Sequence, residues 1–298
     1  MSRRSSSQII TSVAAAIFLS TSALGQTIHP RFSPDGQSVL FYNRTGDTAS
    51  VEIVDLLGGN PRVLLADQGY YGNPGYIGDT DSIIIAGALD GMRGSWELYR
   101  LEQDGELIAL TQTPEREMHP SSDSQGTHIA FVRFIDTGAH LFLLDLTTGL
   151  EVQLTEGDGQ HFHPKFSSDG EWLYFDRTMD NNTGIYRVRL SDRDIQSVVN
   201  LEQTEGRAST PSLSPNGEFL AYSRQDDGGN HLIIRSLASG HDDMVLTNAL
   251  GIGGSHWSPD GTHLVYHRQF EAGYQIEILD IQSGEIDVLV GTPIGADD

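Results

Sequence analysis

Three histidines hold the same place in three copies of one recurring phrase. His29, His119 and His163 are each followed directly by proline, and Asn73 and Thr210 hold the same place in two further copies. Imidazole nitrogens are good ligands for zinc, copper, iron and nickel. If the fold brings these positions together, the sequence therefore predicts a ligand or metal site there.

A fourth histidine extends this candidate site. His161 precedes His163 by two residues, so both side chains would share one face of an extended strand. Glu117 and Asp158 stand close to these histidines in sequence and would add carboxylates. A structural interpretation stays open beside the metal site: His-Pro can be a phrase that starts a strand, with the imidazole packed against a neighbouring repeat.

The sequence predicts no catalytic residue. It has no Gly-x-Ser-x-Gly elbow, no cysteine, no His-Glu-x-x-His and no phosphate-binding loop. Ser255 and His256 are neighbours, and neighbours in a strand point to opposite faces. Acidic loops such as 180–182 offer oxygen ligands for calcium, but none has the spacing of an EF-hand, and ordinary turns explain them.

The phrase that carries the histidines belongs to a repeat of about 45 residues. Its copies begin at positions 29, 73, 119, 163, 210 and 254. The most complete copy reads His-Pro-Arg-Phe-Ser-Pro-Asp-Gly over residues 29–36. Ser, Pro, Asp and Gly in this order suit a type I turn, because proline presets φ and the short polar side chains bond nearby N–H groups. Each copy is therefore expected to end in a tight turn.

Short apolar runs follow each turn and set the fold class. Residues 38–42, 172–175 and 263–266 alternate as second strands do, and a third strand and a short outer strand complete each unit. Four short antiparallel strands in about 45 residues is the period of a propeller blade. We therefore expect an all-β, six-bladed β-propeller of four-stranded antiparallel blades over residues 26–298, with the inner strands around a central channel. A β-solenoid is the competing architecture.

The first 25 residues have the pattern of a signal peptide. Arg3 and Arg4 form a positive start, residues 9–19 are mostly apolar, and small residues precede an expected cleavage near Gly25. No later apolar run approaches the roughly 18 residues of a membrane-spanning helix. The sequence thus predicts a periplasmic or secreted protein with no transmembrane segment.

The composition is strongly acidic. Eighteen Lys and Arg residues stand against 41 Asp and Glu, the formal net charge is −23, and Lys165 is the only lysine. Such a surface repels nucleic acid and anionic lipid, so we expect no nucleic-acid partner. There are no cysteines, so the apolar core and not disulfides must stabilise the fold.

The turn phrase resembles the WD40-like (PD40) repeats of TolB-type propellers. The copies at 29–36, 163–170, 210–217 and 254–261 carry it best, and Leu-Thr pairs at 110–111 and 154–155 match that family's blade ends. The resemblance implies a six-bladed propeller of the cell envelope. It also implies that the N-terminal domain of TolB is lacking, because the first repeat begins a few residues after the expected cleavage.

Two functions follow from these expectations. The first is a module that binds an envelope protein or a small ligand at the channel face. The second is a metal-dependent lyase or hydrolase for an acidic carbohydrate, with His29, His119, His161 and His163 as ligands of a divalent transition metal. Here the run of Gln160, His161 and His163 is similar to the manganese cluster of propeller-type oligogalacturonate lyases. The missing nucleophile favours the binding module, and a scaffold without a ligand site is a third alternative.

Overall fold

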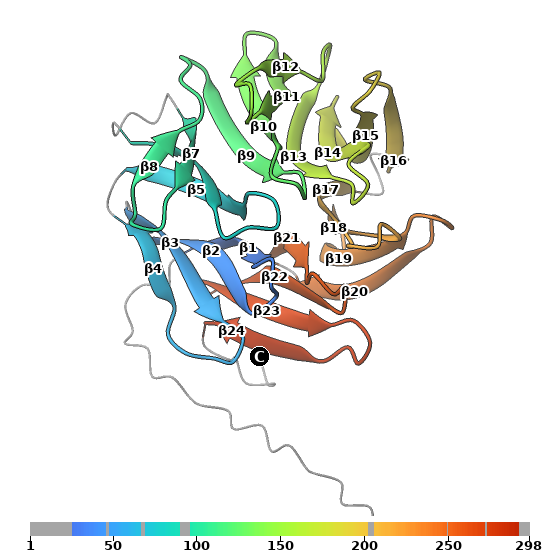
Figure 1. Cartoon of the computed structure of the whole chain (residues 1–298). Coiled ribbons are helices and arrows are strands. Elements are labelled where there is room, and N and C mark those ends of the chain that lie inside the picture. The colour runs from blue at the N-terminus through green and yellow to red at the C-terminus, as the bar shows by residue number, and fades with distance from the viewer. Residues whose placement is uncertain are drawn as a thin grey trace, which may run out of the picture.

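The computed structural model describes residues 26–45, 48–66, 69–89, 96–201, 206–248, 250–271 and 273–291. Across these residues the chain forms 24 strands and no helix. The strands make six sheets, each of four antiparallel strands that follow one another in sequence, and the sheets form a ring around a central axis (Figure 1). The predicted six-bladed β-propeller is thereby confirmed, and the solenoid is excluded. The predicted signal peptide, residues 1–25, lies outside the described residues.

The six blades follow the six sequence repeats. Blades 1 and 2 comprise β1 (Gln26–Phe32), β2 (Ser38–Thr45), β3 (Thr48–Asp55) and β4 (Arg62–Ala66), then β5 (Tyr70–Tyr76), β6 (Ile83–Ala88), β7 (Glu97–Leu101) and β8 (Leu107–Ala109). Blades 3 and 4 comprise β9 (Arg116–Ser122), β10 (His128–Ile135), β11 (Gly138–Asp145) and β12 (Glu151–Gln153), then β13 (Gln160–Phe166), β14 (Trp172–Met179), β15 (Asn182–Arg189) and β16 (Ile195–Val199). Blades 5 and 6 comprise β17 (Arg207–Leu213), β18 (Phe219–Asp226), β19 (Gly229–Ser236) and β20 (Asp242–Asn248), then β21 (Gly251–Trp257), β22 (His263–Phe270), β23 (Gly273–Asp280) and β24 (Ile286–Val290).

The Ser-Pro-Asp-Gly phrase forms the turn that the sequence predicts. In blade 1 the N–H of Gly36 donates to the carbonyl of Ser33 at 2.9 Å, which closes the turn. The Ser33 hydroxyl donates to Oδ1 of Asp35 at 2.6 Å and accepts the N–H of Ser38 at 3.0 Å. Gly36 has a φ of 70°, a value that favours glycine. The turn therefore starts the second strand at a fixed residue.

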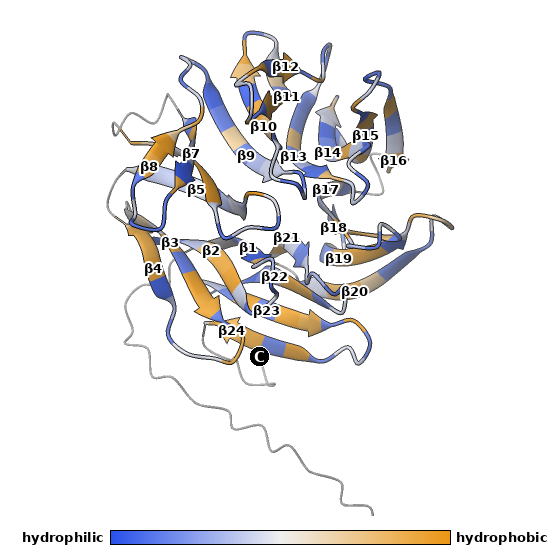
Figure 2. Ribbon diagram, viewed as in Figure 1, coloured by the Kyte–Doolittle hydropathy of each residue, from blue (hydrophilic) through white to orange (hydrophobic). Residues whose placement is uncertain are grey.

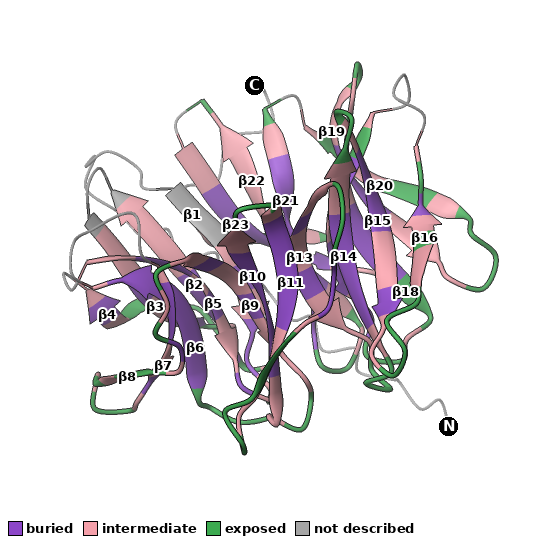
Figure 3. Ribbon diagram, turned by 90° about the horizontal axis from the view of Figure 1, so that it is seen from above, coloured by how far each residue is buried: buried purple, intermediate pink, exposed green. Residues whose placement is uncertain are grey.

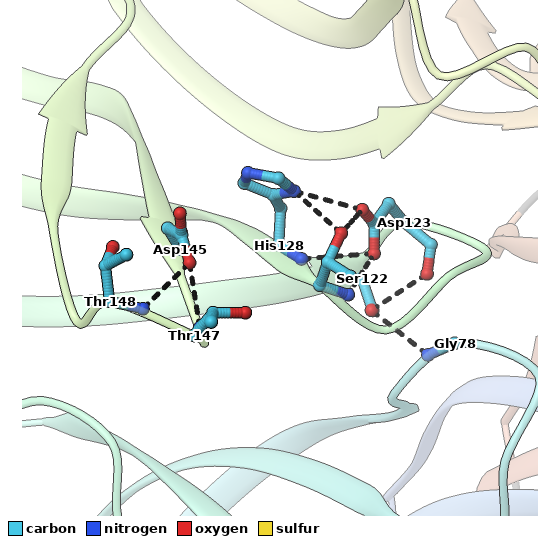
Figure 4. A network of polar contacts seen from close by, with 8 residues as sticks. Gly78, Ser122, Asp123, His128, Asp145, Thr147 and Thr148 are labelled. Atoms are coloured by element: carbon cyan, nitrogen blue, oxygen red, sulfur yellow. Dashed lines mark hydrogen bonds and ion pairs between the residues drawn. The ribbon is translucent and has the colours of Figure 1, made fainter.

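The turn of blade 3 reaches the same geometry with different residues. Asp123 stands where blade 1 has serine, and its Oδ1 accepts the N–H groups of Thr127 at 2.8 Å and His128 at 3.1 Å (Figure 4). The neighbouring Ser122 hydroxyl accepts the N–H of Gly78 at 3.0 Å, a contact between blades 2 and 3. A carboxylate with two acceptor oxygens thus replaces the serine and aspartate pair of the complete phrase.

Apolar side chains fill the space between every pair of neighbouring blades. Between blades 2 and 3, for example, Ile84 and Leu98 pack with Phe131, and all three are fully buried. The strands carry the apolar residues (Figure 2), and the buried residues lie along the strands while the exposed ones lie mainly in turns and loops (Figure 3). A blade has two faces to cover, so each blade depends on both of its neighbours.

Blade 6 meets blade 1 through the same kind of packing. Phe41 of β2 shares an apolar cluster with Val265 of β22. Nη1 of Arg31 also donates to the carbonyl of Gly254 at 3.3 Å. Each described sheet uses four consecutive strands, so in these parts of the chain the ring closes by side-chain packing and not by a strand shared between first and last blades.

The described residues do not include a helix long and apolar enough to span a bilayer.

Candidate functional site

Each inner strand contains a bulge where the sequence repeat begins. The pairing between the inner and second strands shifts register near this point in all six blades. The residue at the repeat start has a positive φ in every blade, between 51° and 62°. The six residues are His29, Asn73, His119, His163, Thr210 and Gly254. The repeated phrase is thus a repeated backbone conformation.

The bulge explains the recurring proline but not the histidines. Proline has no N–H for a β ladder and is therefore tolerated at edge strands and bulges, and these inner strands are the edges of their sheets. Positive φ favours glycine, and a residue with a Cβ costs roughly 1–2 kcal/mol there. Gly254 shows that glycine fits this position in blade 6. The three histidines therefore carry a backbone cost that the strand geometry does not require.

The histidines of blades 1, 3 and 4 meet in the central channel. The rings of His119 and His163 stack with their centroids 4.1 Å apart, and the centroid of His29 lies 6.0 and 5.9 Å from them. One nitrogen from each of the three rings lies within 4.8 Å of the other two. Asn73 and Thr210 occupy the equivalent bulge positions of blades 2 and 5. The ring of blades has brought together residues that are more than 130 positions apart in sequence.

A second layer of polar side chains supports this cluster from the second strands. Asp176 of β14 is buried, and its Oδ1 lies 2.7 Å from Nδ1 of His163 and accepts the N–H of Thr210 at 3.0 Å. His267 occupies the equivalent position on β22, and its ring approaches His29 edge-on at 6.3 Å. Neither residue is among the ligands predicted from the sequence, although each stands six residues after the glycine of its turn phrase. That shared offset is the signal that could have found them.

The structure separates His161 from the other three histidines. Its buried ring lies 5.3 Å from the ring of His140 and 5.5 Å from that of Phe175, and its Nδ1 lies 3.1 Å from the carbonyl of Ala139. These neighbours belong to the interface between blades 3 and 4. Two residues along a regular strand return to the same face, but the bulge at His163 interrupts that alternation.

The two carboxylates considered with the histidines also lie elsewhere. Glu117 is fully buried and accepts hydrogen bonds from Arg133, including one from Nε at 2.8 Å. Asp158 stands in the exposed loop before β13, where its backbone carbonyl accepts Nη2 of Arg177 at 2.6 Å. Neither belongs to the group of three histidines.

Burial favours the neutral form of His29, His119 and His267. Burial holds the pKa of His29 and of His119 well below the usual 6.5, and the charges of Arg31 and of the neighbouring histidines act in the same direction. Burial also lowers the pKa of His267 to about 4. Neutral imidazole has a lone pair that can accept a hydrogen bond or bind a metal. His29 and His119 thus present acceptor nitrogens at neutral pH.

One end of the channel opens into a basin of about 870 Å³. The turns of all six blades surround it, and its floor carries the six residues that stand two positions after the bulge. These floor residues are Arg31, Gly75, Ser121, Lys165, Ser212 and His256. Burial lowers the pKa of Arg31 to about 10 and that of Lys165 well below its usual 10.5. Neither residue of this pair is predicted as a site residue from the sequence, although Lys165 is the only lysine and both residues follow a His-Pro step.

The opposite end of the channel has a smaller cavity of about 360 Å³ between blades 4, 5 and 6. Asp176, Thr210 and His267 line it, together with Arg207 from the start of β17. Ser212, at the other end of β17, lines the basin. The histidine cluster therefore lies between two openings, and its supporting residues face the smaller one.

Solved structures of other propellers resemble this fold. TolB of Acinetobacter baumannii superposes with a TM-score of 0.71 and 15% identity, over 90% of this chain and 64% of that chain. An oligogalacturonate lyase in complex with manganese superposes with a TM-score of 0.61 and 13% identity, over 91% of this chain and 78% of that chain. Identities this low show a shared fold alone.

Sequence comparisons define the family. An uncharacterized protein of Agrobacterium fabrum is 24% identical over 202 residues, which is 66% of this chain and 65% of that relative. Residues 85–295 match the family model of the TolB β-propeller domain, PD40, which covers more than half of the chain. Together with the six four-stranded blades, this match shows that the chain belongs to the TolB β-propeller family.

Proposed function

We propose that this chain is an exported binding module whose basin takes a carboxylate of an envelope protein or a small ligand. One observation carries the proposal: in a chain of net charge −23, the only lysine and Arg31 both stand on the floor of the basin. They belong to blades 4 and 1, which lie opposite each other in a ring of six. Export rests on the signal-peptide pattern of residues 1–25.

The two cations favour an anion because each is partly buried and neither forms an ion pair with a carboxylate among the described residues. Burial is the main reason that the pKa of Lys165 is low, and the charge of Arg31 lowers it further. A bound carboxylate would reverse both effects, since an opposite charge nearby favours the protonated amine. Charge-assisted hydrogen bonds of this kind are among the stronger polar contacts in proteins.

The rim of the basin is acidic, and its charge limits which kinds of ligand can bring a carboxylate to the floor. Asp35, Asp79, Asp81 and Asp123 line it, in or beside the turns that end the inner strands. A polyanion would therefore be repelled at the rim, while a polypeptide segment with one acidic group and basic neighbours would match both floor and rim. The charge pattern supports a peptide of mixed charge as the ligand.

The test uses two short peptides, one with a single glutamate between lysines and one with glutamine in its place. Isothermal titration calorimetry should show that the mature protein binds the glutamate peptide at least tenfold more tightly. Lys165→Gln and Arg31→Gln should each abolish that preference, and raised salt should weaken binding. Arg62→Gln is the matched control, because it removes one positive charge from the exposed start of β4. Equal affinity for both peptides, or a preference that survives Lys165→Gln, would contradict the proposal.

A second candidate is a metal-dependent lyase or hydrolase for an acidic carbohydrate. Its support is the channel cluster of His29, His119 and His163, together with the fold shared with the manganese-bound oligogalacturonate lyase. The acidic rim weighs against a polyanionic substrate. Ultraviolet absorbance of unsaturated uronate, measured with polygalacturonate and Mn²⁺, decides between the two functions. Product formation that depends on His119 would support the lyase, and its absence at high enzyme concentration would leave the binding module.

A further inference from the structure

We propose that His29, His119 and His163 bind one divalent transition metal of the zinc, nickel and copper class within the channel, and that Asp176 positions His163 for it. The inference goes beyond the peptide-binding basin; it deepens the second candidate function, which uses this same cluster, but it requires no lyase or hydrolase activity. It rests on the placement of three rings, one hydrogen bond and one unpartnered nitrogen.

The three nitrogens are close enough to converge on one ion. They lie within 4.8 Å of one another and come from β1, β9 and β13 of three different blades. Zinc–nitrogen bonds of about 2.0–2.1 Å in a tetrahedron place ligand nitrogens roughly 3.3 Å apart. The rings therefore need to close by about 1.5 Å, a movement that side-chain rotation supplies. Three protein ligands would leave a fourth coordination position for water or a small ligand.

Asp176 fixes the orientation of one of these rings. It lies 2.7 Å from Nδ1 of His163, and in the tautomer with its proton on Nδ1 this group donates to the carboxylate while Nε2 carries the lone pair. A carboxylate that holds the far nitrogen of a histidine is the usual outer partner of a metal-bound imidazole. Asp176 is itself held in place, since it also accepts the N–H of Thr210 at 3.0 Å.

His119 has a nitrogen that the protein leaves without a partner. Its Nδ1 is buried, and none of the described residues forms a hydrogen bond with it. It shares this state with other buried side-chain atoms of the described residues, and it is available to a group from outside the protein chain, such as a water molecule or a metal ion. The ring also stacks on His163 at 4.1 Å, which brings it to the ring that Asp176 orients.

The backbone conformation at the bulge does not require histidine, so the imidazoles have a role beyond forming the strand. The six bulge positions share one positive φ, and Gly254, Asn73 and Thr210 show that this conformation accepts other residues. Histidine at three of the six is therefore a choice of side chain and not of backbone. Imidazole nitrogen suits zinc, nickel and copper, whereas calcium takes oxygen ligands, so the donor set selects against calcium.

Titration of the metal-stripped mature protein with Co²⁺ tests the proposal directly. The protein is purified without a histidine tag, and binding is followed by calorimetry and by the visible absorption of the cobalt ion. We expect one Co²⁺ per chain with the intense absorption of four-coordinate geometry. His119→Gly and His29→Gly should weaken binding at least 100-fold, and excess Zn²⁺ should displace the cobalt. Glycine is the chosen replacement because it adopts positive φ without strain.

Two further variants test whether Asp176 positions His163 without binding the metal, and whether cobalt binds in the channel and not to surface histidines. Asp176→Asn keeps an acceptor for His163 but removes the charge, so affinity should fall by roughly 10–100-fold while the cobalt spectrum keeps its form. His241→Gln is the control, because the His241 side chain is 72% exposed far from the channel, and it should bind as the wild type does.

Three results would overturn the proposal. They are no saturable Co²⁺ binding by the wild type, equal binding by His119→Gly and His241→Gln, or an octahedral spectrum that all variants share. Thermal unfolding of each variant shows whether it is folded. If His119→Gly fails to fold, His119→Asn decides the question, since Asn73 holds the same backbone conformation in blade 2.

Discussion

The histidines at the bulges of the inner strands have a positive φ, so their backbone strain can be considered apart from their side-chain contacts. His29 and His163 share this conformation, but only His163 has a buried carboxylate, that of Asp176, at hydrogen-bond distance. A change to glycine relieves the backbone at both positions. It removes a hydrogen bond only at His163, where it also leaves the buried Asp176 with one partner fewer.

We therefore expect opposite effects from His29→Gly and His163→Gly on the metal-free protein. His29→Gly should leave the free energy of unfolding unchanged or raise it by up to about 1 kcal/mol. His163→Gly should lower it by about 1–3 kcal/mol, because Asp176 loses a hydrogen bond in a buried site. Urea unfolding followed by circular dichroism measures both. A loss above about 2 kcal/mol in His29→Gly would show that the ring is a packing residue.

The sequence reveals which positions line the channel but not which rings meet. The recurring His-Pro phrase was enough to group His29, His119 and His163, because equivalent positions of a propeller converge. His161 was grouped with them on the alternation of a regular strand, which fails where the bulge intervenes. Asp176 and His267 come from second strands, and their part in the cluster depends on how the bulge aligns two strands. Their shared offset of six residues from the turn glycine marks both positions, but it does not show which inner-strand residue each one faces.

A buried group of acids at the interface of blades 2 and 3 is the least expected feature among the strands. Arg133 of β10 contacts both Glu117 and Glu151. The Thr111 hydroxyl lies within hydrogen-bond distance of both Glu97 and Glu117. A hydroxyl has one proton to donate, so one of these two carboxyl groups must be protonated for both contacts to be hydrogen bonds. Burial raises the pKa of Glu117 to about 7, which makes it that group.

This protonation predicts a specific dependence of stability on pH. The pKa of Glu117 is higher in the folded state than its ordinary value of 4.5, so the folded protein retains a proton that the unfolded chain releases. The contribution of this group is complete below pH 4.5 and is lost as pH rises through about 7. The melting temperature of Glu117→Gln relative to wild type should therefore increase from pH 4.5 to pH 7.

Circular dichroism melts at several pH values test this expectation. Glu151→Gln is the control, because its carboxylate contacts the same Arg133 from a partly exposed place. A difference between Glu117→Gln and wild type that stays constant over this range would show that Glu117 is ionised throughout. The turns of the complete Ser-Pro-Asp-Gly copies, by contrast, are predictable from the sequence, because the serine, aspartate and glycine interactions are confined to consecutive residues.

The ring is closed by the contact between the last blade and the first, and the sequence does not predict this interface. Phe41 and Val265 lie more than 220 positions apart, and the repeat pattern does not predict that they pack together. The described sheets show four consecutive strands in each blade, so this closure has the same chemistry as the other five interfaces.

Phe41→Ala and Phe131→Ala compare the closing interface with an internal one. Both phenylalanines are fully buried, so each change should cost about 3–5 kcal/mol. Hydrogen exchange should rise mainly in blades 1 and 6 for Phe41→Ala and in blades 2 and 3 for Phe131→Ala, because each cavity weakens one contact. Mass spectrometry of peptides from each blade locates the effect. An identical pattern for both variants would mean that the ring opens only as a unit.

A ring of self-contained blades has no obligatory first blade. Every sheet is built from one uninterrupted stretch of sequence, so a circular permutant that starts at blade 2 or blade 4 would break no strand pairing within any sheet. The same modularity means that whole blades can be duplicated or lost as units during evolution. What such changes cannot preserve is the angular position of the channel residues, since the histidine cluster depends on blades 1, 3 and 4 standing at fixed places in a six-part circle.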